Sequence, residues 1–308
     1  MVIKVFIDGS SGTTGLNIKS RLGAREDVTL ITLGENERKD VSARADAIRS
    51  SDVSFLCLPD DAAREIVSQV PDAPSVIIDT STAHRVAPGW TYGFAELKGR
   101  RARIAASNRI ANPGCHASGF IALVAPLVNA GVIKKDASLS CFSLTGYSGG
   151  GKKMIADYED PLRADALKAP AMYSLAQKHK HLPEMVNECR LERAPVFCPI
   201  VSSYYAGMEV VVPLSANDVK CGIDDIKAVY RSVYTGKVVK FAESVAENGF
   251  LSAGAFAGRD DMEISVLGSD DRITLVARFD NLGKGACGAA IQNMNIALSL
   301  PEETGLVL

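Results

Sequence analysis

The chain has 308 residues, of which 47% are hydrophobic and 23% are charged, and its formal net charge is −2. This length can bury the cores of two domains, and the nearly neutral balance offers no broad basic field for nucleic acid. No apolar run approaches the ~20 residues that span a bilayer, and the N-terminus enters a strand pattern without a signal-peptide layout. We therefore expect a cytoplasmic protein without a nucleic-acid or membrane partner.

Strand-like apolar runs alternate with helical stretches over the first 110 residues, as in a parallel sheet that is covered by helices. The predicted strands are nearly all apolar, which is expected when both faces of a sheet are buried. The predicted strands are 2–7, 28–33, 53–58, 76–79 and 104–106, and the predicted helices are 14–22, 41–49 and 62–69.

The first strand runs into a GxxGxxG turn before a helix. Glycines there allow a tight turn, and a helix N-terminus presents N–H groups to a pyrophosphate, although a plain strand-to-helix loop has the same pattern. The cofactor choice stays open from position alone. Glu35 could bind a ribose hydroxyl of NAD, whereas Arg38 and Lys39 could meet the 2′-phosphate of NADP. The turn consists of Gly9, Ser10, Ser11, Gly12, Thr13, Thr14 and Gly15.

One cysteine, Cys115, follows a Pro-Gly turn and precedes small residues that could open a helix. The N–H groups and dipole at a helix N-terminus favour a thiolate, which is the nucleophilic form. The alternative is a small buried hydrophobe. The seven cysteines are odd in number and contain no CxxC pair, so the sequence predicts neither a disulfide framework nor a zinc site.

The four histidines divide into two kinds. His84 and His116 stand alone and are expected to be structural or surface residues. His179 and His181 form a His-Lys-His stretch, and an imidazole near Cys115 would complete a nucleophile and acid/base pair. The spacing of this stretch does not suit two ligands on one helix face, so we expect no metal.

Beyond Cys115 the apolar runs become short, polar-bounded or alternating, which favours a largely antiparallel sheet. Helices are predicted at 223–234 and 284–300, and a flexible glycine-rich loop at 146–153. The strand-like runs are 138–144, 199–203, 208–212, 250–251, 264–268 and 273–277.

Six separated segments agree, in chain order, with one known family. They are 9–16, 79–85, 92–97, 112–115, 179–184, and 280–285 with 292–293. In these segments the chain resembles N-acetyl-gamma-glutamyl-phosphate reductase in its shorter form, a relative of aspartate-semialdehyde dehydrogenases and of the glyceraldehyde-phosphate dehydrogenase fold. Two details depart from the family pattern, the Ser10-Ser11 pair and Lys180 between the histidines. They concern phosphate and substrate contacts rather than the type of reaction.

The resemblance implies NADPH-dependent reduction of N-acetyl-gamma-glutamyl phosphate to the 5-semialdehyde, with release of phosphate, in arginine biosynthesis. Cys115 would form a thioester, and His179 would be the acid/base by its place in the family motif, although either histidine could hold that role. Implied substrate-binding residues are Arg85, Asn112, His181 and Glu184. Implied cofactor-binding residues are the glycine turn with Asn281, Lys284 and Gly285.

The resemblance and the patterns together predict an α/β protein. Its Rossmann-like NADP-binding domain would comprise residues 1–114 and 282–308. An α+β catalytic and dimerisation domain with a largely antiparallel sheet would comprise 115–281, and the protein would be a homodimer or homotetramer. Two alternatives stay open: a related semialdehyde dehydrogenase acting on aspartyl phosphate or a lysine-pathway acyl phosphate, and a non-catalytic dinucleotide-binding redox sensor.

Overall fold

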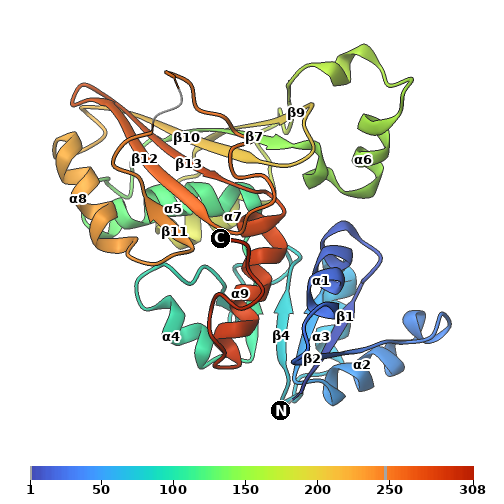
Figure 1. Cartoon of the computed structure of the whole chain (residues 1–308). Coiled ribbons are helices and arrows are strands. Elements are labelled where there is room, and N and C mark those ends of the chain that lie inside the picture. The colour runs from blue at the N-terminus through green and yellow to red at the C-terminus, as the bar shows by residue number, and fades with distance from the viewer. Residues whose placement is uncertain (1, 246–247) are drawn as a thin grey trace. The chain divides into compact units, whose positions relative to one another are not determined.

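The computed structural model of the chain describes residues 2–245 and 248–308 (Figure 1). Two compact units make up the chain, each with its own sheet. The N-terminal unit consists of Met1–Ala95, Gly99–Pro113 and Ala286–Leu306. The central unit consists of Glu96–Lys98, Gly114–Gly285 and Val307–Leu308. The predicted domain ranges include residues 1, 246 and 247, which lie outside the described residues.

A six-stranded parallel sheet forms the N-terminal unit, in the order β2-β1-β3-β4-β6-β5. The strand order reverses between β1 and β3, and ligands of such sheets bind beyond the carboxyl ends of the strands at that point. The prediction of a Rossmann-like parallel sheet is confirmed. The strands are β1 (Ile3–Asp8), β2 (Val28–Ile31), β3 (Val53–Leu56), β4 (Val76–Asp79), β5 (Thr91–Tyr92) and β6 (Arg109–Ala111).

Helices cover both faces of this sheet, because alternate strand residues supply two separate cores. Val5 of β1 packs in one core with Ile18 and Met294, whereas Phe6 packs in the other with Ile48 and Ile66. The helices of this unit are α1 (Thr13–Gly23), η1 (Glu37–Lys39), α2 (Val41–Ser50), α3 (Asp60–Ser68), α4 (Arg100–Ala105) and α9 (Gly288–Ala297).

Four element predictions are wrong in detail, and the fourth, the loop at 146–153, is described with the central unit. The strand expected at 104–106 is the end of helix α4, and the strand β6 follows three residues later. A run of three apolar residues does not distinguish a helix from a strand, and Ile104 is buried as a helical residue. Residues 250–251 form no strand, and the final predicted helix is divided into a π-helical turn η4 (Gly283–Cys287) and α9.

The central unit contains a seven-stranded sheet in the order β11-β12-β13-β10-β7-β9-β8. Two of its pairings are parallel, β11 with β12 and β7 with β9, and the other four are antiparallel. The prediction of a largely antiparallel sheet is confirmed. The strands are β7 (Ser140–Gly146), β8 (Ala171–Met172), β9 (Val196–Ser202), β10 (Met208–Ser215), β11 (Val239–Phe241), β12 (Met262–Ser269) and β13 (Arg272–Phe279).

Helix α5 (Cys115–Asn129) is the core element of this unit. It packs against β10 and β13 on one face of the sheet, and α7 (Leu182–Cys189) and α8 (Ile223–Val233) pack against it in turn (Figure 1). Its residues from His116 to Val128 are all buried. The glycine-rich loop predicted at 146–153 is instead ordered as η2 (Tyr147–Gly150) and the start of α6 (Gly151–Glu159), and η3 (Asp165–Lys168) follows.

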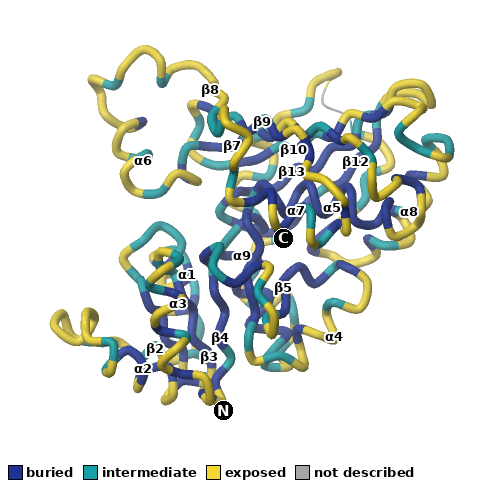
Figure 2. Tube along the Cα trace, turned by 180° about the vertical axis from the view of Figure 1, so that it is seen from behind, coloured by how far each residue is buried: buried dark blue, intermediate teal, exposed yellow. Residues whose placement is uncertain are grey.

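The other face of the seven-stranded sheet carries apolar side chains that these helices do not cover. Along β7, exposed and partly exposed residues alternate with buried ones (Figure 2). Phe142 is 43% exposed, Met172 51% and Val196 57%, and the strand register places all three on one face. We call this surface the open face. Its apolar members are Phe142, Leu144, Met172, Val196, Cys198, Ile200, Val211, Pro213 and Leu267.

Candidate active site

Cys115 is the first residue of α5 and is partly exposed, whereas the rest of that helix is almost wholly buried. The residue before it, Gly114, adopts an extended conformation and provides no side-chain cap. A Cβ added to Gly285 would lie 2.9 Å from the Cβ of Cys115. The thiol therefore lies at the positive end of a helix dipole, beside a glycine that leaves room for it.

Glu184 on α7 reaches the same helix end. Its Oε2 accepts a hydrogen bond from the backbone N–H of Gly114 at 3.1 Å, and the residue is only 1% exposed. His181, which immediately precedes α7, lies with its Nε2 3.9 Å from Glu184 Oε1. The fold thus brings two residues of the predicted histidine stretch to the N-terminus of the helix that carries Cys115.

Three histidine rings form a compact cluster here. The ring centroids of His179 and His181 are 4.6 Å apart, and His116 lies 5.5 Å and 5.6 Å from them. Burial, together with the nearby His179, lowers the pKa of His116 to about 3, so this imidazole is neutral at physiological pH. The sequence predicted a structural or surface role for His116. Its ring is buried and lies beside those of His179 and His181, within the candidate site.

The two predicted histidines differ in their hydrogen bonds. His179 Nδ1 accepts a hydrogen bond from the backbone N–H of His181 at 3.1 Å. A neutral His179 must therefore carry its proton on Nε2, where it acts as a donor. His181 is the histidine that faces a carboxylate, that of Glu184.

The loop that carries these histidines is strained and fixed. Ser174 and Gln177 have φ values of 55° and 54°, in the left-handed region that side chains rarely adopt. The Gln177 side chain donates to the carbonyl of Phe197 at 2.8 Å and accepts from its N–H at 2.9 Å. Two hydrogen bonds to β9 thus hold a loop whose conformation is costly, as is common at functional sites.

Tyr173 and Ser143 belong to the site, although the sequence analysis did not identify them. His116 Nε2 lies 2.6 Å from the Tyr173 hydroxyl, and His116 Nδ1 lies 2.7 Å from Ser143 Oγ. Burial raises the pKa of Tyr173, and the neighbouring Cys115 raises it further. No sequence motif indicates either residue, because strand pairing brings them together. Ser143 lies on β7, Tyr173 directly follows β8, and both of these strands pair with β9.

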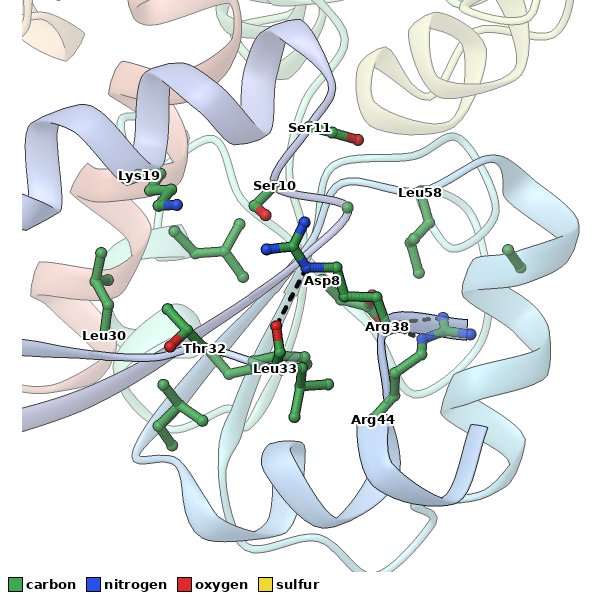
Figure 3. Close-up of a pocket in the computed structure, with 15 residues that line it drawn as sticks. Asp8, Ser10, Ser11, Lys19, Leu30, Thr32, Leu33, Arg38, Arg44 and Leu58 are labelled. Carbon is green, nitrogen blue, oxygen red and sulfur yellow. Dashed lines mark hydrogen bonds and ion pairs between the residues drawn. The ribbon is translucent and has the colours of Figure 1, made fainter. Parts of the chain in front are cut away.

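The N-terminal unit contains a cavity of about 230 Å³ beyond the carboxyl ends of β1 and β2 (Figure 3). It includes three predicted cofactor residues, Gly9, Ser10 and Ser11, with Arg38, Arg44 and Lys19 as its cationic side chains. The lining residues are Phe6, Ile7, Asp8, Gly9, Ser10, Ser11, Lys19, Leu30, Ile31, Thr32, Leu33, Arg38, Arg44, Leu58 and Ala62.

The glycine turn fits a dinucleotide pyrophosphate. Gly9 has φ +82°, and a Cβ added there would lie 2.2 Å from the Cys57 carbonyl oxygen. A Cβ on Gly15 would lie 2.5 Å from the Gly9 carbonyl oxygen. Helix α1 begins after Gly12 without a side-chain cap, and the buried Thr13 Oγ1 has no hydrogen-bond partner in the described chain. Uncapped N–H groups and an unsatisfied hydroxyl are suited to phosphate oxygens.

The end of β2 carries the residues that bear on the choice of nucleotide. Thr32 and Arg38 line the cavity, whereas Glu35 and Lys39 are not among its lining residues. Arg38 Nε donates to the Leu33 carbonyl at 3.2 Å, which holds the side chain at the cavity (Figure 3). Arg44 is engaged with Asp8 in a buried ion pair of 2.8 Å. Burial raises the pKa of Asp8, although Arg44 opposes this effect.

Four other predicted residues make structural contacts. Arg85 is buried and donates to the carbonyls of Asn112 at 3.0 Å and Thr80 at 3.1 Å. The amide of Asn112 donates to the Ala286 carbonyl at 3.0 Å.

In the central unit, Asn281 donates to Ser148 Oγ at 2.9 Å and accepts from the Gly207 N–H at 3.0 Å. Lys284 is fully buried, with Nζ 2.8 and 2.9 Å from the carboxylate oxygens of Glu96. Binding roles for Arg85, Asn112, Asn281 and Lys284 stay predictions.

Metal and membrane features are missing from the described residues. No group of three or more His, Cys, Asp or Glu side chains in residues 2–245 and 248–308 is arranged to hold a metal ion. Within the same ranges, no helix has both the length and the apolar character to span a membrane.

Comparison with known proteins defines the class of this site. Residues 4–106 match the profile of the semialdehyde dehydrogenase NAD binding domain, and residues 115–281 match that of the semialdehyde dehydrogenase dimerisation domain. Aspartate semialdehyde dehydrogenase II from Vibrio cholerae has the same fold, with a TM-score of 0.72 and 15% identity over 97% of this chain and 99% of that one. The enzyme from Candida albicans with NADP superposes with a TM-score of 0.66 at 16% identity, covering 96% of this chain and 98% of its own. Fold and site together define an NAD(P)-dependent oxidoreductase of the semialdehyde dehydrogenase type.

Closer relatives give the family within that class. The chain is 47% identical over 306 residues to N-acetyl-gamma-glutamyl-phosphate reductase of Brucella ovis, covering 96% of this chain and 98% of the relative. It is 46% identical over 308 residues to the enzyme of the same name from Sinorhizobium medicae, covering 96% and 99%. The chain belongs to the N-acetyl-gamma-glutamyl-phosphate reductase family. The predictions of an α/β oxidoreductase of this family are confirmed.

The buried, neutral His116 gives the protein an acid-sensitive stability. The unfolded chain binds a proton at this residue near pH 6.5, whereas the folded chain does so only near pH 3. The unfolded state therefore holds more protons between these values, and stability falls as the pH falls through them. We expect His116→Gln to show a weaker loss of unfolding free energy between pH 6.5 and 4 in urea titrations. An equal loss in both proteins would contradict a neutral His116.

Proposed function

We propose that this chain reduces N-acetyl-gamma-glutamyl phosphate to N-acetyl-glutamate 5-semialdehyde with NADPH and releases phosphate, as a step in arginine biosynthesis. The observation that carries this proposal is the placement of Cys115 at the N-terminus of α5, in the same unit as the cluster of His179, His181 and Glu184. The central unit would perform the covalent chemistry, and the N-terminal unit would bind the dinucleotide.

Cys115 is the proposed nucleophile. Its thiolate attacks the acyl carbon, a C–S bond forms, and the carbonyl electron pair moves to oxygen. When the carbonyl re-forms, the C–O bond to phosphate breaks, and phosphate leaves with that electron pair. The product is a thioester on Cys115, which divides a difficult reduction into two easier steps. When NADPH is bound, it supplies the hydride that converts the thioester into the aldehyde.

The histidines would have separate tasks. A hydrogen bond from the backbone N–H of His181 occupies His179 Nδ1, so His179 is suited to donate from Nε2 to a developing oxyanion. His181 faces Glu184, whose carboxylate favours the imidazolium form. We therefore assign proton transfer with the Cys115 thiol to His181, and oxyanion stabilisation to His179. The family motif alone places His179 in the acid/base role.

The cofactor of this chain is proposed to be NADP rather than NAD. A ribose hydroxyl of NAD is commonly bound by an acid after the second strand, whereas an arginine nearby accommodates the 2′-phosphate of NADP. Of the candidate residues that follow β2, Arg38 lines the cavity together with Thr32, whereas Glu35 does not. The pyrophosphate would lie on the N–H groups of the turn at 9–15.

A second copy of the chain is the proposed partner of the open face. An apolar sheet surface with Phe142 and Val196 about half exposed is unusual in a monomer, and the matching family profile for residues 115–281 is described as a dimerisation domain. We propose that two copies bring their open faces together in a homodimer, which could pair further into a tetramer.

The reverse reaction tests the proposed activity. We expect phosphate-dependent reduction of NADP at 340 nm with N-acetylglutamate semialdehyde but not with aspartate semialdehyde. Cys115→Ser should lower the rate at least about 10³-fold, because a weak hydroxyl replaces the thiolate. Cys198→Ser, on the open face, is the matched control. A preference for aspartate semialdehyde would indicate a sister activity, and dinucleotide binding without turnover would indicate a redox sensor.

Replacing Arg38 tests the choice of cofactor. A charge-assisted hydrogen bond is worth about 1.5–3 kcal/mol, so Arg38→Ala should raise the KM for NADPH roughly 10- to 100-fold. The KM for NADH should stay nearly constant, because NADH lacks the 2′-phosphate. Lys39→Ala serves as the control, since Lys39 does not line the cavity. Equal changes for both nucleotides would contradict 2′-phosphate recognition by Arg38.

A charge on the open face tests the assembly. Phe142→Asp would place a carboxylate in an apolar interface, which costs several kcal/mol when the charge is unpaired. We expect the variant to sediment as a monomer in analytical ultracentrifugation, while the parent protein sediments as a dimer or tetramer. Leu162→Asp, at an exposed residue outside the sheet, controls for added charge. An unchanged assembly would place the interface elsewhere.

A further inference from the structure

Ser143, His116 and Tyr173 form a hydrogen-bonded chain whose proton positions can be derived. The outer atoms lie 2.7 Å and 2.6 Å from the two ring nitrogens of His116. Since His116 is neutral, one ring nitrogen donates and the other accepts. Two arrangements are therefore possible, and they differ in the direction in which all three protons point.

The buried serine distinguishes the two arrangements. Ser143 is fully buried, and within the described chain its hydroxyl has no hydrogen-bond partner other than His116. If His116 Nδ1 donated to Ser143, the serine proton would be buried without an acceptor, which is costly. The serine hydroxyl therefore donates to Nδ1, and His116 carries its proton on Nε2.

This arrangement sets the direction of the tyrosine proton. His116 Nε2–H donates to the Tyr173 oxygen, so the hydroxyl proton of Tyr173 points away from His116. Tyr173 is only partly buried, and the described residues offer its hydroxyl no second hydrogen-bond partner. Its proton can thus reach a ligand, which the serine proton cannot. The hydrogen-bonded series from Ser143 through His116 therefore leaves the Tyr173 hydroxyl as a donor that faces the site.

We propose that Tyr173 donates a hydrogen bond to the substrate's carbonyl oxygen as that oxygen becomes an oxyanion, and that Ser143 and His116 position it. This deepens the proposed function and rests on it. No proton is transferred: the tyrosine stays neutral while the C–S bond forms and the carbonyl electron pair moves to oxygen. Three observations support this role.

The tyrosine lies in the cluster, with its ring 5.7 Å from that of His179. Its hydroxyl is hydrogen-bonded to His116, the residue that follows Cys115. Its raised pKa, due to burial and then to Cys115, keeps it protonated as a donor. Tyr173 and His179 would together supply two donors to one oxygen, the usual number in an oxyanion hole.

Kinetics of Tyr173→Phe test the proposal. Loss of one oxyanion donor typically costs about 10²- to 10³-fold in kcat, and we expect such a loss with little change in KM. Alkylation of Cys115 by iodoacetamide should proceed at the parental rate, because the donor acts on the substrate oxygen rather than on the thiol. Tyr230→Phe removes a buried hydroxyl that donates to the Leu123 carbonyl, so it should lower stability and leave kcat unchanged.

Nitrogen NMR of the folded protein tests the positioning chain. The ¹⁵N shifts of His116, assigned by their absence in His116→Gln, should report a proton on Nε2. A proton on Nδ1, or a Tyr173→Phe variant with parental kcat, would overturn the proposal while the parent enzyme still turned over. A parent protein that is inactive with every semialdehyde and phosphate would instead overturn the proposed function.

Discussion

The N-terminus of α5 is the constraint on which the central unit depends. Thirteen consecutive buried residues fix this helix between the sheet and its neighbouring helices, so its first residue cannot move without repacking the core. Cys115 occupies that first position, where the helix dipole is strongest and solvent can still enter. The proposed nucleophile therefore lies at the start of a helix that is buried along its length, and loops supply the groups around it.

Two negative charges at the N-terminus of α5 would need a positive charge nearby. A thiolate at Cys115 is favoured by the dipole, but the buried carboxylate of Glu184 binds the same end of the helix through the Gly114 N–H. Two anions so placed repel each other unless a cation lies between or beside them. His181 is the group that faces Glu184 and can supply this charge. His116 is held neutral and cannot supply a positive charge. We therefore expect His116 and His181 to have different functions within the cluster.

Local sequence patterns predict the parts of this structure that short segments determine. The glycine turn at 9–15, the parallel strands before it and after it, and Cys115 at a helix start are all read from short segments. Contacts that depend on pairing between distant strands have no such local pattern. Tyr173 and Ser143 meet His116 because β8 and β7 pair with the strands of one sheet, and neither residue has a signature at its own position. The apolar run at 104–106 predicted a strand where helix α4 ends, because three apolar residues do not distinguish the two structures.

The residues of the family motifs differ in the contacts that they make in the structure. Arg85, Asn281 and Lys284 belong to segments that match the family, yet their polar atoms hold main-chain turns or a buried ion pair. Removing one partner of such a buried pair leaves an uncompensated charge, so these positions are constrained by folding as well as by any ligand. His179, His181 and Glu184 make contacts of another kind. Glu184 accepts from the N–H before α5, His181 faces that carboxylate, and the His181 backbone N–H donates to His179. A matching motif therefore contains both residues that are proposed to act on the substrate and residues that hold the framework, and their contacts in the folded chain distinguish the two.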